Sequence, residues 1–252
     1  MDGGALKLYE ALGISSGDVV AFAGAGGKSS AIRHMAAELS AAGMKVVVSP
    51  TTKMGLTEIG DLGPLVVSED LTELLNETQE ALESSSVVVL GGERISKSRI
   101  GGVTPEHFEE IARLVDVVLV EADGARHRSI KGTAEYEPLL PDNVSLVVAV
   151  GGIDVLGKSV EPENVHRPEI FAELTGVNLG GSITASAFAR ALSKGSLRGL
   201  PASSRAAVLI TGVSPGQTMS AAATVTRELW NSDIATVVFT NLSSDIPQVW
   251  SP

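Results

Sequence analysis

The stretch VVAFAGAGGKSSAI, from Val19 to Ile32, decides how the rest of the chain is interpreted. Its apolar start is typical of a short buried strand, four glycine or alanine residues follow, and Lys28-Ser29-Ser30 opens a helical pattern. A strand, a small-residue loop and a helix start in this order can bind a phosphate group. The alternative is a tight turn that uses its glycines only for backbone freedom.

The loop fits the Walker A motif only in part. That motif is G-x-x-x-x-G-K-[ST], in which backbone N–H groups surround the phosphates, the lysine reaches the terminal ones and the hydroxyl binds Mg²⁺. Gly27, Lys28 and Ser29 fit its second half, whereas Phe22 occupies the place of its first glycine. The deviant form K-G-G-x-G-K-[ST] also fits in part, because alanines stand where its first lysine and second glycine belong. We favour a nucleotide-binding loop of neither standard form.

A dinucleotide-binding loop is the competing interpretation. Its fingerprint, G-x-G-x-x-G, matches Gly24 and Gly26 but meets Ser29 in place of the third glycine. The acid expected roughly 20 residues further on is also missing, since Ser49-Pro50-Thr51 stands there. A simple turn would not require Lys28 at the helix start, where the helix dipole opposes a positive charge unless an anion is bound. Phosphate binding is therefore the prediction.

The composition narrows the classes of function. The chain has 30 acidic and 19 basic residues, a formal charge of -11, which disfavours a broad surface for nucleic acid or anionic membrane. An anion would need a local site. Cysteine is absent and the histidines lack ligand-like spacing, so we expect no disulfide and no zinc site. The opening residues show no leader pattern and no apolar run reaches the length of a membrane span, so we expect a cytoplasmic protein without membrane partners.

Eight short β-branched runs alternate with helical patterns along the chain. The runs are VVAFAG (19–24), KVVVSP (45–50), PLVVS (64–68), SVVVLGG (86–92), DVVLVEADG (116–124), SLVVAVGG (145–152), RAAVLITG (205–212) and IATVVFTNL (234–242). Helices are expected near 28–42, 69–83, 104–114, 167–175, 184–194 and 218–230. Continuously apolar strands between helices predict an α/β fold with a mainly parallel, doubly wound sheet. We expect a single domain over residues 1–252, with a possible C-terminal subdomain from about residue 195, after a surface linker near 193–205.

Acids and cations gather directly after the run at 117–120. Glu121 and Asp123 point the same way in an extended chain, so both could face one crevice and hold a metal or divide metal-binding and base roles. Such a carboxylate is expected at the end of a strand beside a phosphate-binding loop. Arg126, Arg128 and Lys131 follow on the same irregular segment. The alternative is that these acids and bases pair with one another in solvent.

Two further segments supply candidate ligands. In SPTTKM (49–54), the hydroxyls of Thr51 and Thr52 could ligate Mg²⁺ or phosphate, and Lys53 is a further positive charge, although a turn after Pro50 explains these residues as well. In ENVHRPEIF (163–171), His166 and Arg167 precede a proline that would start a helix. An arginine at a helix start is better explained by an anion or an acidic partner.

Taken in order, these segments resemble the YqeC family, described as accessory proteins of selenium-dependent molybdenum hydroxylases in selenium cofactor biosynthesis. The resemblance lies in GAGGKSS, SPTTKM, VLVEADGARHRSIKGTAEYEPLLP, VVAVGGIDVLGK and VHRPE, spread over Gly24 to Glu169. It implies a P-loop NTPase-like fold and a role in preparing or inserting a selenium-containing molybdenum cofactor. The family motifs carry onto Gly24, Gly26, Gly27, Lys28 and Ser29, onto Thr51, Thr52 and Lys53, onto Glu121, Asp123, Gly124 and Lys131, and onto His166, Arg167 and Glu169.

One departure from the resemblance concerns the base. An Asn-Lys-x-Asp-like stretch, which selects guanine, would follow a late strand, but the chain reads Thr211-Gly212-Val213-Ser214 there. The nucleotide is therefore left as ATP or GTP.

The sequence thus predicts a Mg²⁺-dependent, nucleotide-binding accessory protein that hydrolyses an NTP or transfers a nucleotidyl group to a cofactor intermediate. Gly24 to Gly27 would surround the phosphates, Lys28 would offset charge at the β and γ positions, Ser29 and Asp123 would bind the metal, and Glu121 with Asp123 would hold metal or orient the attacking group. Further expected phosphate or cofactor ligands are Ser30, Thr51, Thr52, Lys53, Arg126, Lys131, His166 and Arg167.

Two alternatives stay open. The first is an oxidoreductase that holds NAD(P) on the same loop. The second is a non-catalytic carrier or chaperone of a molybdenum cofactor, in which Arg126, Arg128 and Lys131 bind an anionic pterin phosphate.

Overall fold

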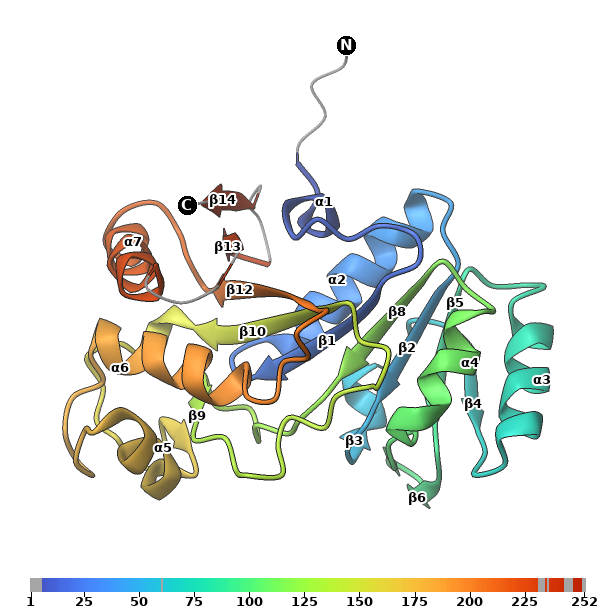
Figure 1. The fold of residues 1–252 in the computed structure, drawn as a ribbon, viewed down its shortest axis with the longest axis horizontal. Helices are drawn as coiled ribbons and strands as arrows, with labels where there is room; N and C mark the ends of the chain where they lie inside the picture. The colour runs from blue at the N-terminus through green and yellow to red at the C-terminus, as the bar shows by residue number, and fades with distance from the viewer. Residues whose placement is uncertain (1–5, 60, 231–233, 235, 243–246, 251–252) are drawn as a thin grey trace, which may run out of the picture.

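A nine-stranded sheet forms the centre of the protein in a computed structural model that describes residues 6–59, 61–230, 234, 236–242 and 247–250 (Figure 1). The strand order is β14-β13-β12-β10-β1-β8-β2-β5-β4. Neighbouring strands are parallel except β13 and β14, which are antiparallel. This confirms the α/β fold with a mainly parallel sheet. The opening residues 1–5, on which part of the expectation of no leader rests, lie outside the described residues.

The eight predicted strands are all strands of this sheet. Their bounds are β1 (Val19–Gly24), β2 (Val46–Pro50), β4 (Leu65–Val67), β5 (Val87–Gly91), β8 (Val117–Glu121), β10 (Leu146–Gly152), β12 (Arg205–Thr211) and β13 (Thr236–Thr240). A ninth, β14 (Gln248–Trp250), adds an antiparallel edge that the sequence did not indicate. Residue 235, at the start of the last predicted run, lies outside the described residues.

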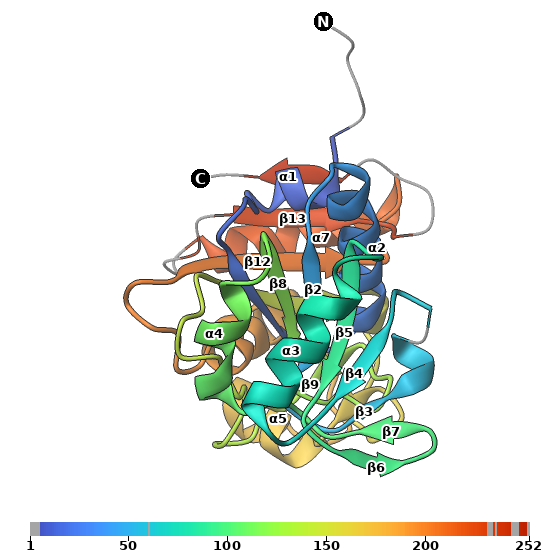
Figure 2. The same ribbon diagram turned by 90° about the vertical axis from the view of Figure 1, so that its right-hand side faces the viewer.

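Short strands that the sequence did not indicate form two small sheets beyond the carboxyl ends of the main strands. One consists of β3 (Met54–Gly55), β7 (Arg99–Ile100) and β6 (Arg94–Ser96), and Figure 2 shows its hairpin at the lower edge of the molecule. The other pairs β9 (Ile130–Lys131) with β11 (Val165–His166). These sheets tie the irregular segments after β2, β5, β8 and β10 to one another.

The predicted helices are present, with differences at their ends. The helices are α1 (Leu8–Ala11), α2 (Lys28–Ala41), α3 (Leu71–Ala81), α4 (Phe108–Ala112), α5 (Pro168–Thr175), α6 (Ala185–Arg190) and α7 (Gln217–Leu229), with 3₁₀ turns η1 (Leu56–Glu58), η2 (Pro105–His107) and η3 (Ile153–Val155). The helix expected from residue 104 starts as η2, and Thr104 makes no capping hydrogen bond. Within the described residues, no helix is both long and apolar enough to cross a membrane.

The segment expected to be a surface linker is buried in part. Helix α6 continues as the π-helix η4 (Ala191–Ser196), in which Gly195 and Ser196 are buried. Strand β12 then joins the main sheet beside β10. The prediction of a surface linker is therefore wrong for residues 195–197, which are buried where the chain leaves the π-helix that packs against β1 and β10.

Two hydrophobic cores cover the two faces of the sheet, as alternating side chains along each strand require. One contains Phe22 and Leu119 with α1 and α2, and the other contains Ala21 and Val120 with α3 to α7. The sheet is thus doubly wound, and its strands are buried on both faces as their continuous apolar runs predict.

Strand β1 lies between β8 and β10, at the point where the order of the sheet reverses. The chain after β1 builds β2, β5 and β4 on one side and later adds β10, β12 and β13 on the other. In open α/β sheets, the crevice at the carboxyl ends of such strands is where ligands bind. The glycine loop, Glu121 and Gly152 end these three strands and meet there.

Candidate functional site

A cavity of about 800 Å³ opens at the carboxyl ends of β1, β8 and β10. Its walls come from the start of α2, from the segment after β2 and from the irregular segment after β8. The lining residues are Gly26, Gly27, Lys28, Ser29, Ser30, Arg33, Lys53, Met54, Gly55, Thr57, Glu58, Arg99, Glu121, Gly124, Ala125, Arg126, His127, Arg128, Ser129, Gly152, Asp154 and Thr211.

The glycine loop owes its shape to close backbone contacts. Gly24 and Gly26 have backbone φ angles of +103° and +74°, which residues other than glycine rarely adopt. A Cβ on Gly26 would lie 2.2 Å from the backbone nitrogen of Gly152, and a Cβ on Gly24 would lie 2.4 Å from the carbonyl oxygen of Val150. The loop therefore packs directly against the end of β10, and only glycine fits at these two positions.

The loop amides are used in two ways. The amides of Gly24, Ala25 and Gly26 donate to Asp123, to Val150 O at 3.0 Å and to Arg128 O at 2.9 Å, respectively. By contrast, the amides of residues 27–30 at the start of α2 have no acceptor among the described residues. Gly24 and Gly26 thus shape the loop, and the amides that can meet a phosphate lie at the helix start.

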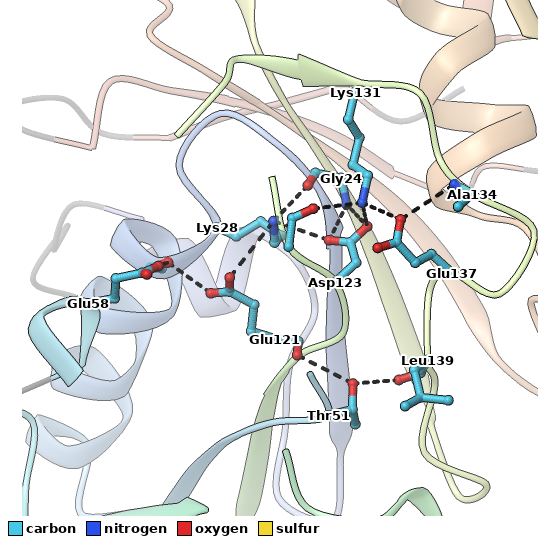
Figure 3. Close-up of polar contacts among 12 residues, drawn as sticks. Gly24, Lys28, Thr51, Glu58, Glu121, Asp123, Lys131, Ala134, Glu137 and Leu139 are labelled. Atoms are coloured by element: carbon cyan, nitrogen blue, oxygen red, sulfur yellow. Dashed lines mark hydrogen bonds and ion pairs between the residues drawn. The ribbon is translucent and has the colours of Figure 1, made fainter. Parts of the chain in front are cut away.

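A chain of alternating charges runs beneath the loop, as Figure 3 shows for most of its members. Lys28 Nζ donates to Gly24 O at 2.6 Å and lies 3.2 Å from Asp123 Oδ1 and 3.9 Å from Glu121 Oε1. Lys131 Nζ lies 3.0 Å from Asp123 Oδ2 and 2.7 Å from Glu137 Oε2. Arg167 closes the series by pairing with Glu137. We call Glu121, Lys28, Asp123, Lys131, Glu137 and Arg167 the charge chain.

The two lysines of the charge chain are held inside the protein. Lys28 is 4% exposed, Lys131 is 1% exposed, and Asp123 between them has no exposed surface. Burial alone would lower the pKa of Lys28, but Asp123 and Glu121 outweigh it and raise that pKa. Burial opposes ionisation of Glu137, whereas Arg167 and Lys131 lower its pKa. These charges satisfy one another, so the chain fixes the loop after β8 against the loop after β1.

Two carboxylates share one hydroxyl at the Glu121 end of the charge chain. Ser29 Oγ lies 2.8 Å from Glu121 Oε2 and 3.0 Å from Glu58 Oε2. A hydroxyl has one proton, so it can fully satisfy only one of these acceptors. Burial raises the pKa of Glu121, and nearby Glu58 and Asp123 add to the effect, although Lys28 and Ser29 oppose it. The site therefore favours an added positive charge beside Glu121.

A second cavity of about 680 Å³ adjoins the first. We call it the basic cavity. Lys53, Arg99, Gly124, Arg126 and Arg128 line both cavities. The remaining lining residues are Thr52, Tyr136, Glu137, Pro162, Val165, His166, Arg167 and Pro168. Burial, together with Arg167 and Lys131, lowers the pKa of His166 to about 4, so this imidazole is neutral at pH 7.

The structure brings most of the predicted site residues to these two cavities. Gly26, Gly27, Lys28, Ser29, Ser30 and Glu121 line the first, Thr52, His166 and Arg167 line the second, and Lys53 and Arg126 line both. Four predicted residues line neither cavity: Gly24, Thr51, Asp123 and Lys131. Thr51 donates to Leu139 O at 2.7 Å and thereby fixes the segment before β10.

Several lining residues were not among the predictions. Glu58 lies on a 3₁₀ turn and Arg99 on a two-residue strand, and neither has a local sequence pattern that points to a site. Asp154 follows β10 as Glu121 ends β8, so the same rule of acids at strand ends could have found it.

Known proteins resemble this chain in sequence over its first two thirds. The YqeC family model, described as "YqeC protein", matches residues 20–169. "Uncharacterized protein YqeC" of Escherichia coli (strain K12) is 34% identical over 161 residues, which are 63% of this chain and 61% of that protein. The match thus spans less than two thirds of the relative's length.

Solved structures show a weaker likeness. FtsY from Mycoplasma mycoides has a TM-score of 0.40 and 10% sequence identity, over 93% of this chain and 63% of that chain. A second FtsY crystal structure from the same organism has a TM-score of 0.37 and 11% identity, over 93% and 64% of the two chains. TM-scores of this size do not identify a fold, so the fold assignment depends on the sheet topology described above.

Proposed function

The chain belongs to the YqeC family, and we propose that it binds the phosphates of ATP or GTP together with Mg²⁺ in the first of the two cavities, which we call the nucleotide cavity. One observation carries this proposal. The start of α2 presents the unpaired amides of residues 27–30 beside Ser29 and the two carboxylates of Glu58 and Glu121. Donors for a phosphate and oxygen ligands for a cation thus lie next to each other, as a metal–nucleotide complex requires.

The helix start would hold the phosphates. Its free N–H groups lie at the N-terminal end of α2, which lines the cavity and where the helix dipole adds positive potential. Arg126 and Lys53 line the same cavity and have no carboxylate partner among the described residues. Lys28 can offset the charge of a polyphosphate from its place in the charge chain. Arg126 and Lys53 lie on the wall that this cavity shares with the basic cavity.

The oxygen ligands fit Mg²⁺. Among the described residues, no group of three or more acidic, histidine or cysteine side chains could hold a metal unaided. Mg²⁺ is usually bound by one or two carboxylates, with substrate phosphates and water completing its ligands. Ser29, Glu121 and Glu58 supply such a partial set, and a cation there would relieve the sharing of one hydroxyl by two acids. When bound, the metal would offset the charge of the phosphates.

Asp123 was predicted from the sequence to bind the metal, and we now propose another role for it. Both its oxygens accept from Gly24 N–H, and it lies between Lys28 and Lys131. With no exposed surface, it has no access to a cation in the cavity. We assign Asp123 to positioning Lys28, and the metal to Ser29, Glu121 and Glu58.

The cellular role that we propose depends on the resemblance to the YqeC family. It implies an accessory function in maturing the cofactor of a selenium-dependent molybdenum hydroxylase, with Mg²⁺-dependent NTP hydrolysis or nucleotidyl transfer as the reaction. Release of phosphate supports hydrolysis, and release of pyrophosphate supports nucleotidyl transfer. Incubation with ATP or GTP, with and without Mg²⁺, followed by analysis of both products, distinguishes the two reactions.

Calorimetric titration with ATP and GTP in the presence of Mg²⁺ tests the binding site. We expect Ser29→Ala to weaken binding by about tenfold, since a hydrogen bond to a charged group contributes about 1.5 kcal/mol or more. Lys28→Ala should abolish nucleotide binding. If the Lys28→Ala variant fails to fold, Ser29→Ala still tests the site. Arg113→Ala, on exposed α4, is the control for loss of one positive charge. Equal affinity of wild type and Ser29→Ala would refute the proposed site, and binding of NADPH alone would favour an oxidoreductase.

The pH dependence of Mg²⁺ binding gives an independent check. Because the pKa of Glu121 is raised, its proton competes with the metal at pH values above the usual range for a glutamate. Mg²⁺ affinity in the presence of nucleotide should therefore fall as pH is lowered through this raised pKa. Glu121→Gln should bind Mg²⁺ weakly at every pH, and an unchanged profile in that variant would contradict the assignment.

A further inference from the structure

The basic cavity gathers cations that have no acidic partner. Lys53, Arg99, Arg126 and Arg128 line it, and none of the four forms an ion pair with a carboxylate among the described residues. The one carboxylate on its wall, Glu137, is already paired with Lys131 and Arg167. The cavity is therefore strongly positive.

This concentration of positive charge is not explained by the composition of the chain. Acidic residues outnumber basic ones by 30 to 19. Some basic side chains elsewhere pair with acids, as in Arg113–Glu110, Lys158–Asp154 and Arg205–Asp18, and others have no ion pair among the described residues but do not gather around one hollow. Four unpaired cations around one hollow, in a chain with a surplus of acids, indicate a site for an anion rather than a solvated surface.

The backbone around the basic cavity is held in conformations that cost energy. Among the described residues, the non-glycine residues with positive φ are Arg126 at 47°, His127 at 58° and Arg167 at 57°, and all three line the two cavities. Such conformations persist where the surrounding structure fixes them, and they are concentrated at ligand sites. Arg128 is fixed as well, because its Nε donates to Pro162 O at 2.6 Å.

The opposite wall is preformed. The Arg167 guanidinium lies 5.6 Å from the centre of the Tyr136 ring and donates to Glu137 and to the Tyr136 hydroxyl. Tyr136 is 73% exposed, so it provides apolar surface for the uncharged part of a ligand. A volume of about 680 Å³ lies within the range of small-molecule sites.

From these observations we infer that the basic cavity binds a second ligand, a small molecule that carries a phosphate group. Lys53, Arg126 and Arg128 would surround the phosphate, since guanidinium and ammonium groups are the usual side-chain donors to such dianions. Because these residues also line the nucleotide cavity, the two ligands would lie next to each other. The inference goes beyond nucleotide binding and does not require the nucleotide to be present.

Calorimetry on the full chain, with inorganic phosphate as the probe, tests this inference. We expect Arg126→Ala and Lys53→Ala each to weaken phosphate binding by about tenfold, because each removes a charged donor. Arg113→Ala removes one positive charge at a distance and should leave phosphate binding unchanged. Circular dichroism of all three variants would verify that they are folded.

A second titration separates the basic cavity from the phosphate end of the nucleotide site. Phosphate is titrated at increasing fixed concentrations of a non-hydrolysable ATP analogue with Mg²⁺. A dissociation constant that reaches a plateau supports two sites. A constant that rises in proportion to the analogue concentration means direct competition and overturns the inference, as does an equal affinity of wild type and Arg126→Ala. If phosphate binds and neither ATP nor GTP does, the proposed nucleotide site fails and the basic cavity stands.

Discussion

The basic residues of the charge chain and those of the basic cavity stand in opposite situations. In the charge chain, Lys28 and Lys131 are buried and each lies between two carboxylates. In the basic cavity, Lys53, Arg99 and Arg126 are exposed and have no carboxylate partner among the described residues. The difference shows that cations near one site divide into those that hold the loops and those that are free to meet a ligand. Variants can test each half of this comparison.

The largest effect is expected for Lys131→Met. The variant leaves Asp123 and Glu137 buried without this cation, which costs about 3–5 kcal/mol of unfolding free energy. Chemical denaturation measures the change. Lys158→Met is the matched control, because its pair with Asp154 is exposed and should be worth no more than about 1 kcal/mol. Similar losses of unfolding free energy in both variants would contradict the claim that the buried lysines of the charge chain stabilise the loops.

The next largest effect is expected for Gly26→Ala. The added Cβ would meet Gly152 N at 2.2 Å and would also have to adopt a φ of +74°. A conformational cost of roughly 1–2 kcal/mol and an overpacking cost of roughly 1–3 kcal/mol should add together. Gly43→Ala isolates the first cost, because Gly43 also has positive φ but nothing within 4 Å of its Cβ position. The difference between the two variants in thermal or chemical unfolding measures how tightly the loop is packed; equal losses would show that the contact with β10 is easily relieved.

A smaller effect concerns pH and His166. Its pKa is lowered from the usual 6.5 to about 4, so folding favours the neutral imidazole. The corresponding stability is fully present above pH 6.5 and is lost as pH falls from there through 4. His166→Gln should remove this part of the pH dependence in denaturation curves recorded between these pH values. An unaltered pH profile would mean that burial and the neighbouring cations do not lower the pKa of His166.

The smallest effect on stability is expected for Arg99→Ala. This side chain is exposed and lacks an acidic partner among the described residues, so the free energy of unfolding should change by less than about 0.5 kcal/mol. Phosphate affinity should nonetheless fall, because Arg99 lines the basic cavity. A clear loss of stability without a loss of phosphate binding would reverse the roles assigned to the two groups of cations.

Local sequence patterns predicted the scaffold well and the site in part. The apolar β-branched runs predicted the eight parallel strands of the nine-stranded sheet, because burial on both faces leaves a continuous signal. Strands β3, β6 and β7 have two or three residues and depend on pairing between segments far apart in the chain, so no local pattern marks them. Glu121 was predicted because it ends a strand beside the glycine loop.

The sequence could not tell which charges pair. Lys131 was predicted to bind an anionic ligand, but the chain turns back after β9 and brings Glu137 to 2.7 Å from its Nζ. Likewise, Glu58 reaches Ser29 across 29 positions of sequence, on a turn with no distinguishing residues. The balance between free and satisfied charges is a tertiary property, because it depends on distances between loops that local patterns do not specify.

The charge chain has one more consequence, because it begins on the wall of one cavity and ends on the wall of the other. Glu121 faces the nucleotide cavity and Arg167 faces the basic cavity, with each intermediate member in contact with the next. A ligand that bound Arg167 would compete with Glu137 for this guanidinium, and any resulting change in the charge chain at Lys28 would couple the two cavities. If one ligand changes the affinity of the protein for the other by some factor, the second ligand must change the affinity for the first by the same factor.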